Sequence, residues 1–343
     1  MRQPNLPSNV AGVSNTYARI AGWGKYLPER IMPNAEIEAL IDTNDEWIRS
    51  RSGIAERRIA APDQATSDLA VRAAAEALRV AQVEPNEVDL IIAATATPDY
   101  ANMPATASLV QHALGATRAG AFDLNAVCAG WVYALVTGTQ FVVNGNARNV
   151  LVIGAEVFSR ILDWKDRTTC VLFGDGAGAV LLQPTDRPGG LRSSVLGSDG
   201  SGACHLFVPA GGSRNPATHE SIDRREHFLR MNGREVFRFA TTRMPDAVLV
   251  ALERAGLGPK DVHLLIPHQA NRRIIESAAR RLELPEEAVF SNVERYGNTS
   301  AASVPVALCE ALDAGLVDQH TILAMVAFGA GLSWASAIWE WNS

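Results

Sequence analysis

The chain has 343 residues, of which 47% are hydrophobic and 20% charged, a composition typical of one large or two ordinary globular domains. Lys and Arg number 31 and Asp and Glu 37, so the formal net charge of −6 excludes a generally basic nucleic-acid binder. No apolar run approaches the ~20 residues that cross a bilayer, and the polar N-terminus lacks the apolar core of a secretory signal. We expect a cytoplasmic protein that binds neither nucleic acid nor membrane, with residues 1–17 as a flexible leader.

The cysteines and histidines give no sign of a metal site or a disulfide framework. The four cysteines, at positions 128, 170, 204 and 309, have no CxxC spacing, and the seven histidines form no HExxH pair. This usage is typical of a reducing compartment, and we expect no bound metal.

Taken in chain order, the predicted elements occur twice. In the first half, a helix with one apolar face (67–81) precedes an apolar strand (90–96), a helix that follows AVCAG (126–130), and the strand NVLVIGAE (149–156). In the second half, a helix (236–256) precedes LLIP (264–267), a helix that follows YGNTSA (296–301), and the strand TILAMVAF (321–328).

The strands are continuous apolar runs, which indicates sheets covered on both faces and hence an α/β protein. Val88 aligns with Val262 at an offset of 174 residues, and Cys128 with Ser300 at an offset of 172. We therefore predict two similar halves, 18–186 and 187–343, joined near the turn QPTDRPGG (183–190). Two such halves usually pack face to face, with a site between the loops at their strand ends.

Cys128 lies where a predicted strand gives way to a predicted helix, among small neighbours that leave the sulfur accessible. A helix N-terminus favours the thiolate over the thiol. The other interpretation is a buried inert cysteine, the usual fate of a free thiol, and we apply it to Cys170, Cys204 and Cys309.

Two further polar residues occupy matching positions in the second half. His268 is the first polar group after the strand LLIP, and Asn298 precedes the helix that corresponds to the one after Cys128. Alone, each is explained by a surface histidine or by ordinary turn chemistry. A pseudo-twofold axis would bring these two loops to Cys128, and Cys, His and Asn at one point suit acyl-thioester chemistry.

Two glycine-rich segments admit more than one interpretation. GDGAGAV (174–180) superficially resembles a phosphate loop, but it lacks GK[ST] and continues into apolar residues, so we favour a tight turn between strands. AFGAGLSW (327–334) is predicted at a strand-to-strand corner, where its backbone N–H groups could form an oxyanion hole.

Arginines gather in the second half, and several of them flank the His268 loop. A solvated helix face explains them, as does docking of an acidic or phosphate-bearing partner on an otherwise acidic protein. They are Arg224, Arg225, Arg234, Arg238, Arg272, Arg273, Arg280 and Arg281.

With these residues in hand, the sequence resembles the β-ketoacyl-acyl carrier protein synthase III family, from about Ala18 to the C-terminus. The motifs that carry the resemblance are TNDEWIRSRSGIAERRIA (43–60), AVCAGW (126–131), DRTTCVLFGDGAGAV (166–180), PHQANRRII (267–275), YGNTSAAS (296–303) and AFGAGLSW (327–334). The resemblance implies a thiolase-like fold, with the two halves packed as a five-layer αβαβα sandwich, and a homodimeric enzyme without metal or redox cofactor.

The resemblance also implies a two-step reaction. Cys128 would take an acyl group, expected to be acetyl, from an acyl-CoA, while the backbone N–H groups of Cys128 and Ala330 hold the oxyanion. His268 and Asn298 would then stabilise the enolate that malonyl-acyl carrier protein forms as CO2 leaves. Attack of this carbanion on acyl-Cys128 would give a 3-oxoacyl-acyl carrier protein, the first condensation of fatty acid synthesis.

The same resemblance assigns binding roles to residues around the pocket. The residues implied in CoA binding are Thr43, Trp47, Arg51, Arg167, Gly233, Ala270 and Asn271. Gln269, Ala270, Asn271, Arg272 and Arg273 would meet the acidic carrier protein. Met103 would reach into the partner's primer pocket, and because acetyl-preferring members often have Phe there, the primer length stays open.

Three alternatives remain. One is a related acyltransferase of secondary metabolism with another primer or acceptor, which the intact PHQANRR and GNTSAAS motifs disfavour. Another is a Cys–His–Asn hydrolase, which would need His268 paired to the thiol. The last is a non-catalytic carrier-protein scaffold, which would be expected to have lost Cys128 or Asn298.

Overall fold

The structure is a computed structural model that describes residues 16–342. The predicted leader, 1–17, lies almost entirely outside the described residues. The first strand, β1 (Tyr17–Tyr26), begins one residue earlier than the first half was expected to begin.

A five-stranded mixed sheet forms the core of the first half. Its strand order is β1-β7-β6-β4-β5, in which β6, β4 and β5 run parallel and β7 is antiparallel to both of its neighbours. The four further strands are β4 (Leu90–Ala94), β5 (Gly120–Leu124), β6 (Val150–Val157) and β7 (Asp175–Thr185). Every residue of β4 and β6 is buried, as the continuous apolar runs predict.

A four-stranded sheet, ordered β11-β12-β13-β8, forms the core of the second half. Only β11 and β12 pair in parallel. The strands are β8 (Gly190–Ser198), β11 (Leu264–Pro267), β12 (Ile322–Gly329) and β13 (Ser333–Glu340). The predicted junction between the halves, 186–187, falls in the loop that leaves β7 at Thr185 and enters β8 at Gly190.

Two helices, α5 (Gly130–Val143) and α10 (Ser303–Asp313), lie between the sheets. Their buried side chains join the facing strands of both sheets in one apolar cluster that includes Trp131 and Trp339. Nearly every residue of α10 is buried, because a helix covered on two sides has no solvent face.

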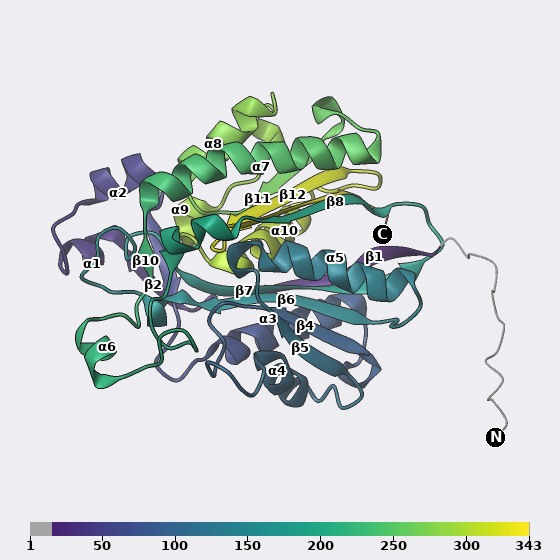
Figure 1. Cartoon of the computed structure of the whole chain (residues 1–343). Helices are drawn as coiled ribbons and strands as arrows, with labels where there is room; N and C mark the ends of the chain where they lie inside the picture. Colours follow the sequence, from purple (N-terminus) through teal and green to yellow (C-terminus); the bar gives the residue numbers. More distant parts are fainter. Residues whose placement is uncertain (1–15, 343) are drawn as a thin grey trace, which may run out of the picture.

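The outer faces of the sheets are covered by helices from their own halves, which makes five layers (Figure 1). The first sheet carries α3 (Thr66–Ala81) and α4 (Thr106–Leu114). The second sheet carries α7 (Gly233–Ala255) and α8 (Arg272–Arg281). This is the layered α/β sandwich that the family resemblance implies.

Shorter elements surround one end of the sandwich. They are β2 (Arg30–Pro33), α1 (Asn34–Glu38), α2 (Asp45–Ser52), β3 (Glu56–Ile59), β9 (Leu206–Phe207), α6 (His219–Asp223), β10 (Arg230–Met231) and α9 (Val293–Tyr296). In Figure 1, α1, α2, α6, β2 and β10 lie to the left, at one end of the sandwich.

The predicted duplication is visible element by element. The strands β4 and β11 keep the offset of 174 residues. The short 3-10 turns before the middle helices, η2 (Val127–Ala129) and η7 (Ser300–Ala302), are offset by 173, so Val127, rather than Cys128, is the counterpart of Ser300. The second half lacks a counterpart of β5 among the described strands, and the bridge from Leu265 to Val289 takes its place.

One local prediction is wrong. The segment GDGAGAV is neither a turn nor a phosphate loop: Asp175–Thr185 is strand β7. Its glycines let a helix approach, since a Cβ on Gly178 would lie 2.7 Å from the backbone N of Val306 in α10. The alternation of Gly and Ala there reflects close helix-on-sheet packing rather than ligand binding.

Candidate active site

Cys128 lies in the turn η2, directly before the middle helix α5. The turn is tight because Val127 has a φ of 49°, a left-handed conformation that costs a β-branched residue conformational energy. The side-chain oxygen of Asn125 accepts a hydrogen bond from the Val127 N–H at 3.0 Å. The sequence signal of a strand, small residues and a helix therefore corresponds to a strained turn that presents one thiol.

The Cys128 thiol is 4% exposed, and burial raises its pKa to about 12, with a further contribution from the Glu156 carboxylate. Ser300 Oγ lies 3.3 Å from the sulfur and donates a hydrogen bond to it, which partly offsets this effect. Desolvation in this buried turn thus opposes the helix terminus, which favours the thiolate.

His268 follows β11, and its side chain is 1% exposed. Burial lowers the pKa of the imidazole to about 3, so His268 is neutral at physiological pH. Its Nδ1 lies 2.5 Å from Ser303 Oγ, and Phe328 packs edge-on against the ring at a centroid distance of 5.3 Å. The helix after this loop, α8, begins at Arg272.

Asn298 is held in place through its backbone and through one side-chain atom. Its N–H donates to Leu172 O at 2.8 Å, its carbonyl accepts from Gly174 N at 3.1 Å, and its Oδ1 accepts from Ser300 N at 2.8 Å. The preceding Gly297 has a φ of 63°, and a Cβ there would lie 2.7 Å from Leu172 O. These contacts leave the Asn298 Nδ2 group to face the pocket.

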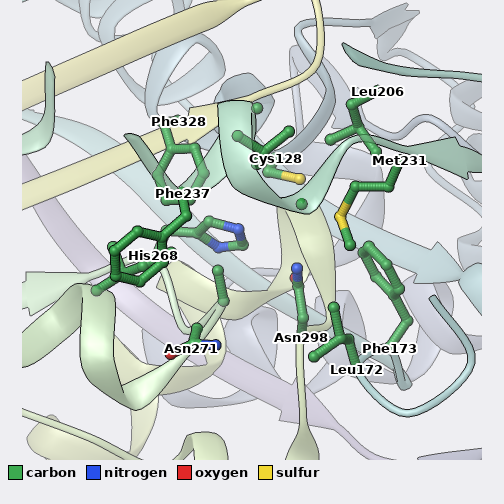
Figure 2. A pocket seen from close by; sticks show the side chains of 15 residues that line it. Cys128, Leu172, Phe173, Leu206, Met231, Phe237, His268, Asn271, Asn298 and Phe328 are labelled. Carbon is green, nitrogen blue, oxygen red and sulfur yellow. The ribbon is translucent and has the colours of Figure 1, made fainter. Parts of the chain in front are cut away.

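The structure brings these three predicted residues together. Cys128 from the first half and His268 and Asn298 from the second line one pocket, and Figure 2 shows the sulfur, the imidazole and the amide directed to its centre. Apolar side chains, among them Phe237 and Phe328, form much of the remaining wall. In such surroundings, hydrogen bonds from fixed donors are stronger than they are in water.

The turn between β12 and β13 reaches the nucleophile, as the corner motif predicts. A Cβ on Gly329 would lie 2.8 Å from the backbone N of Cys128 and 3.2 Å from its Cβ. Ala330 follows and shares a second pocket with Cys128. Backbone from both halves thus meets at the sulfur, which is what an oxyanion hole built from Cys128 and Ala330 requires.

This second pocket extends from the other side of Cys128 and is mostly apolar. Phe158, Ile161, Leu206 and Leu229 are among its lining residues, and none of them was singled out from the sequence. Met103 of the same chain lines neither pocket and is 79% exposed. The predicted role of Met103 in the primer pocket therefore requires a second copy of the chain.

Of the predicted CoA contacts, Trp47 and Arg167 lie together, with the guanidinium carbon of Arg167 4.8 Å from the indole centroid. Arg167 also donates to the carbonyl of Asp42 at 2.9 Å. The Thr43 Oγ1 atom is buried without a hydrogen-bond partner among the described residues. Arg51 is exposed near the end of α2, and its carbonyl accepts from Asn271 Nδ2 at 2.9 Å.

Gly233, Ala270 and Asn271 line the pocket that contains Cys128, as expected for residues along a substrate path. The Asn271 side chain also has a structural task that the sequence analysis did not identify. Its Oδ1 caps α8 by accepting from Arg273 N at 2.8 Å. This cap and the bond to Arg51 O join α2 to α8 at the pocket rim.

The predicted carrier-protein segment, 269–273, is only partly at the surface. Gln269 is 1% exposed and bonds to Pro267 O, Phe290 O and Asn292 N, so it supports the loop from within. Ala270 is also buried, whereas Arg272 and Arg273 are exposed. The inclusion of Gln269 and Ala270 in a docking surface is therefore wrong, because a long polar side chain can also satisfy buried backbone groups.

The clustered arginines divide into two groups. Within the described residues, Arg224, Arg225, Arg238, Arg272 and Arg281 form ion pairs with nearby carboxylates. Arg234, Arg273 and Arg280 form no ion pair with any described residue, and Arg273 lies 5.3 Å from the ring centroid of Phe237, a residue of the pocket wall. Of the three arginines without a carboxylate partner, Arg273 and Arg280 lie on α8 and Arg234 lies in the first turn of α7.

Two residues at the site were not found from sequence. Glu156 is fully buried and bonds to the Ser300 hydroxyl that reaches Cys128, and Phe328 covers His268. Each stands near the end of an apolar strand, where a periodicity search records only the strand. A single carboxylate closing the run VLVIGAE was the available signal for Glu156.

Residues 16–342 contain no cluster of three or more His, Cys, Asp or Glu side chains that could hold a metal ion. No helix in this part of the chain is long and apolar enough to cross a membrane.

Comparison with known proteins identifies relatives over nearly the whole chain. Two family models match: 3-oxoacyl-[acyl-carrier-protein] synthase III over residues 122–200 and its C-terminal counterpart over 252–341. A β-ketoacyl-[acyl-carrier-protein] synthase III of Caldanaerobacter subterraneus is 53% identical over 325 residues, which cover 95% of this chain and 98% of the relative.

Solved structures agree with these matches. The 3-oxoacyl-[acyl-carrier-protein] synthase III of Aquifex aeolicus superposes with a TM-score of 0.87 at 44% identity, covering 94% of this chain and all of that one. The priming β-ketosynthase of the R1128 polyketide pathway superposes with a TM-score of 0.88 at 37% identity, covering 97% of this chain and 99% of that one.

Proposed function

Because the chain belongs to the β-ketoacyl-[acyl-carrier-protein] synthase III family, we propose that it joins an acyl-CoA primer to malonyl-acyl carrier protein with loss of CO2. The product is a 3-oxoacyl-acyl carrier protein, and the reaction is the first condensation of fatty acid synthesis. The observation that carries this proposal is the convergence of Cys128, His268 and Asn298 on one apolar pocket (Figure 2).

In the first step, Cys128 attacks the thioester carbonyl and releases CoA. The approach of Gly329 to Cys128 supports an oxyanion hole between the halves, with the N–H groups of Cys128 and Ala330 as donors. The second pocket takes the acyl chain, since it is apolar and opens beside the sulfur. Covalent capture divides a difficult condensation into two easier reactions.

In the second step, neutral His268 and Asn298 donate hydrogen bonds to the malonyl thioester carbonyl as it becomes an enolate. We assign the His268 proton to Nε2, with Ser303 Oγ donating to Nδ1 across their 2.5 Å contact, which makes Nε2–H a donor. Asn298 Nδ2 has the same freedom, because Oδ1 accepts the turn's own bond from Ser300 N. Loss of CO2 supplies the carbanion, so no strong base, metal or redox cofactor takes part.

The binding roles follow from the same arrangement. Trp47 and Arg167 present flat surfaces to the CoA adenine, Thr43 and Arg51 contact its phosphates, and the pantetheine passes Gly233, Ala270 and Asn271. Arg272 and Arg273 receive the acidic carrier protein, joined by Arg234, which is exposed beside Gly233. The chain works as a homodimer in the cytoplasm, and the partner subunit's Met103 completes the primer pocket.

Secondary metabolism is the less supported setting. The polyketide priming synthase is 37% identical, whereas a synthase III relative is 53% identical over a similar share of the chain.

A direct test is intact-protein mass spectrometry with a panel of acyl-CoAs of increasing length, followed by malonyl-acyl carrier protein. We expect an acetyl adduct on Cys128 that disappears, with CO2 release, when the malonyl donor is added. An adduct that the malonyl donor leaves in place would contradict the proposed function, and the acyl groups that form the adduct measure the length of the primer.

A further inference from the structure

Glu156, near the end of β6, is a carboxylate with no exposed surface. Its oxygens accept hydrogen bonds from Thr95 Oγ1 at 3.2 Å, Thr97 Oγ1 at 2.5 Å and the Ala96 N–H at 3.1 Å. From the second half, Ser300 Oγ approaches Oε1 to 2.9 Å and Ala301 N to 3.4 Å. Glu156 therefore binds loops of both halves at the level of the nucleophile.

The Ser300 hydroxyl connects this carboxylate to Cys128. Its Oγ lies 2.9 Å from Glu156 Oε1 and 3.3 Å from Cys128 Sγ. A hydroxyl has one proton to donate and two lone pairs that accept. Ser300 can consequently accept a proton from one neighbour while donating its own to the other, so the three groups form a continuous path for one proton.

The electrostatic surroundings favour a single negative charge on this path. Burial raises the pKa of Glu156 to about 7, and the Glu156 carboxylate raises the pKa of Cys128. Two adjacent anions are disfavoured, so Glu156 and Cys128 together keep at least one proton. No Lys or Arg among the described residues forms an ion pair or a side-chain hydrogen bond with Glu156, so no fixed cation holds it ionised.

The other titratable groups on neighbouring elements have partners of their own. Asp175 on β7 accepts from Ala60 N and from Ser159, and Asp123 on β5 accepts from Thr106 N and Ala107 N. His268, beyond β11, contacts Ser303. Cys128 is thus the titratable group that the described hydrogen bonds link to Glu156.

We propose that Glu156 holds the Cys128 proton during the catalytic cycle: it takes this proton through the Ser300 hydroxyl on acylation and returns it when condensation frees the sulfur. The inference rests on the proposed function, because it needs an acyl-cysteine intermediate. Glu156 touches no substrate and acts through Ser300, so it is a positioning residue.

The first step balances as follows. The Cys128 thiol gives its proton to Ser300 Oγ, and Ser300 gives its own proton to the Glu156 carboxylate. The sulfur lone pair forms the new C–S bond with the acyl carbon, and the bond from that carbon to the CoA sulfur breaks. CoA leaves as a thiolate and takes a proton from solvent, while Glu156 is left as a neutral carboxylic acid.

The second step reverses the transfer. The malonyl group loses CO2, and the resulting carbanion bonds to the acyl carbon as the bond to Cys128 Sγ breaks with its electrons on sulfur. The thiolate takes a proton from Ser300, which takes one from Glu156. The thiol and the carboxylate are restored, so that one solvent proton is consumed per cycle, at the CoA sulfur.

The relay predicts a pH dependence for the rate of acylation alone. We would mix the enzyme with acetyl-CoA and no malonyl donor at a series of pH values, and follow the adduct over time by intact mass. At about pH 8 most Glu156 is ionised and can accept the Cys128 proton, so we expect fast acylation; at about pH 6 Glu156 is already protonated, and acylation slows.

Two variants interrupt the path at different points. Glu156→Gln keeps the size of the side chain, and Ser300→Ala removes the connecting hydroxyl. Each should slow acylation at about pH 8 by about 100-fold, the scale of general-base assistance. The wild-type acylation rate should rise with pH around pH 7, and this rise should be absent in both variants.

Asp123→Asn is the matched control, since this carboxylate binds two backbone N–H groups of α4 without contact to Ser300. Its acylation rate and pH profile should equal those of the wild type, whereas a merely structural role of Glu156 would leave the rise of the rate with pH in place in Glu156→Gln.

The outcomes separate this inference from the proposed function. A wild-type acylation rate that does not rise with pH around pH 7, or a rise that persists in Glu156→Gln, would overturn the relay alone. If no acyl-CoA gave an adduct on Cys128, the proposed function would fail and the relay with it. The wild-type measurement stands even if a variant fails to fold.

Discussion

The turns that begin the two middle helices share a backbone and differ in their task. Val127 in η2 and Ser300 in η7 both have a φ near 50°. The helix α5 begins directly after η2, and α10 begins directly after η7. In the first half this turn carries the thiol of Cys128; in the second half it carries the Ser300 hydroxyl that contacts the thiol. One strained turn, used twice, thus supplies a nucleophile and its neighbour.

The strands beside these turns diverge in a similar way. Glu156 and Phe328 occupy equivalent positions, because each is the seventh residue of its eight-residue strand, β6 and β12 respectively. Glu156 accepts hydrogen bonds from the Thr97 and Ser300 hydroxyls, and Ser300 also contacts Cys128. Phe328 instead packs an apolar ring against His268. The comparison shows how one scaffold holds a buried acid in one half and a neutral imidazole in the other, so that acyl capture and decarboxylation occupy different halves.

The largest expected effect is at the first-half turn. Cys128→Ser replaces the nucleophile by a hydroxyl that is much harder to ionise, and it should abolish the acyl adduct in intact-protein mass spectra. Cys204→Ser is the control, because Cys204 is exposed and lines neither pocket. A full adduct on the Cys128→Ser protein at another residue would refute the assignment of the nucleophile.

The contact between the halves can be tested at Gly329. A Cβ there would lie 2.8 Å from Cys128 N, so Gly329→Ala should displace the oxyanion donors and slow acylation by about 10- to 100-fold. Gly212→Ala, where a Cβ would meet no atom within 4 Å, should acylate at the wild-type rate. Equal single-turnover rates for the two variants would show that this approach has no part in acyl transfer.

The buried imidazole of the second half predicts a pH effect on stability. The pKa of His268 is about 3 in the folded state and about 6.5 when unfolded, so between these values the unfolded chain binds the extra proton. Stability should fall as the pH drops through this window, with His268 contributing ~2 kcal/mol of the loss between about pH 7 and pH 5.

Denaturant unfolding of the wild type and His268→Gln at both pH values measures this contribution. His112→Gln, at an exposed position on α4, is the control. A wild-type loss that His268→Gln reproduces in full would assign the acid sensitivity to other groups.

The smallest effect concerns the rim of the second half. Arg273→Glu reverses a charge that has no carboxylate partner among the described residues, and it should raise the KM for the malonyl carrier about 10-fold at low salt, less at high salt. Arg148→Glu, just before β6 and far from the pocket, should leave that KM unchanged. Equal effects of the two substitutions would place the carrier elsewhere.

The sequence was sufficient for the duplicated fold and for the three residues at the centre of the pocket, because strand runs and helix starts are local signals that keep register. It was insufficient where the same signal has two physical causes. The glycines of GDGAGAV allow α10 to pack closely on β7 and form no turn. The Gln269 side chain bonds to buried backbone groups and is not at the surface.

Individual contacts between the two halves could also not be predicted from the sequence. The approach of Ser300 to Cys128 spans 172 residues, and that of Glu156 to Ser300 spans 144. The burial that raises the pKa of Cys128 depends on both sheets and the helices between them, so this effect could not be predicted from the helix terminus alone.

The most direct test of this division of labour is to follow both steps in one sample of Asn298→Ala. Acetyl-CoA is added first, malonyl-acyl carrier protein second, and the Cys128 adduct and released CO2 are measured together. We predict a normal adduct that persists, with CO2 release slowed by about 100- to 1,000-fold, since one of two enolate donors is lost. Consumption of the adduct at the wild-type rate would contradict the account.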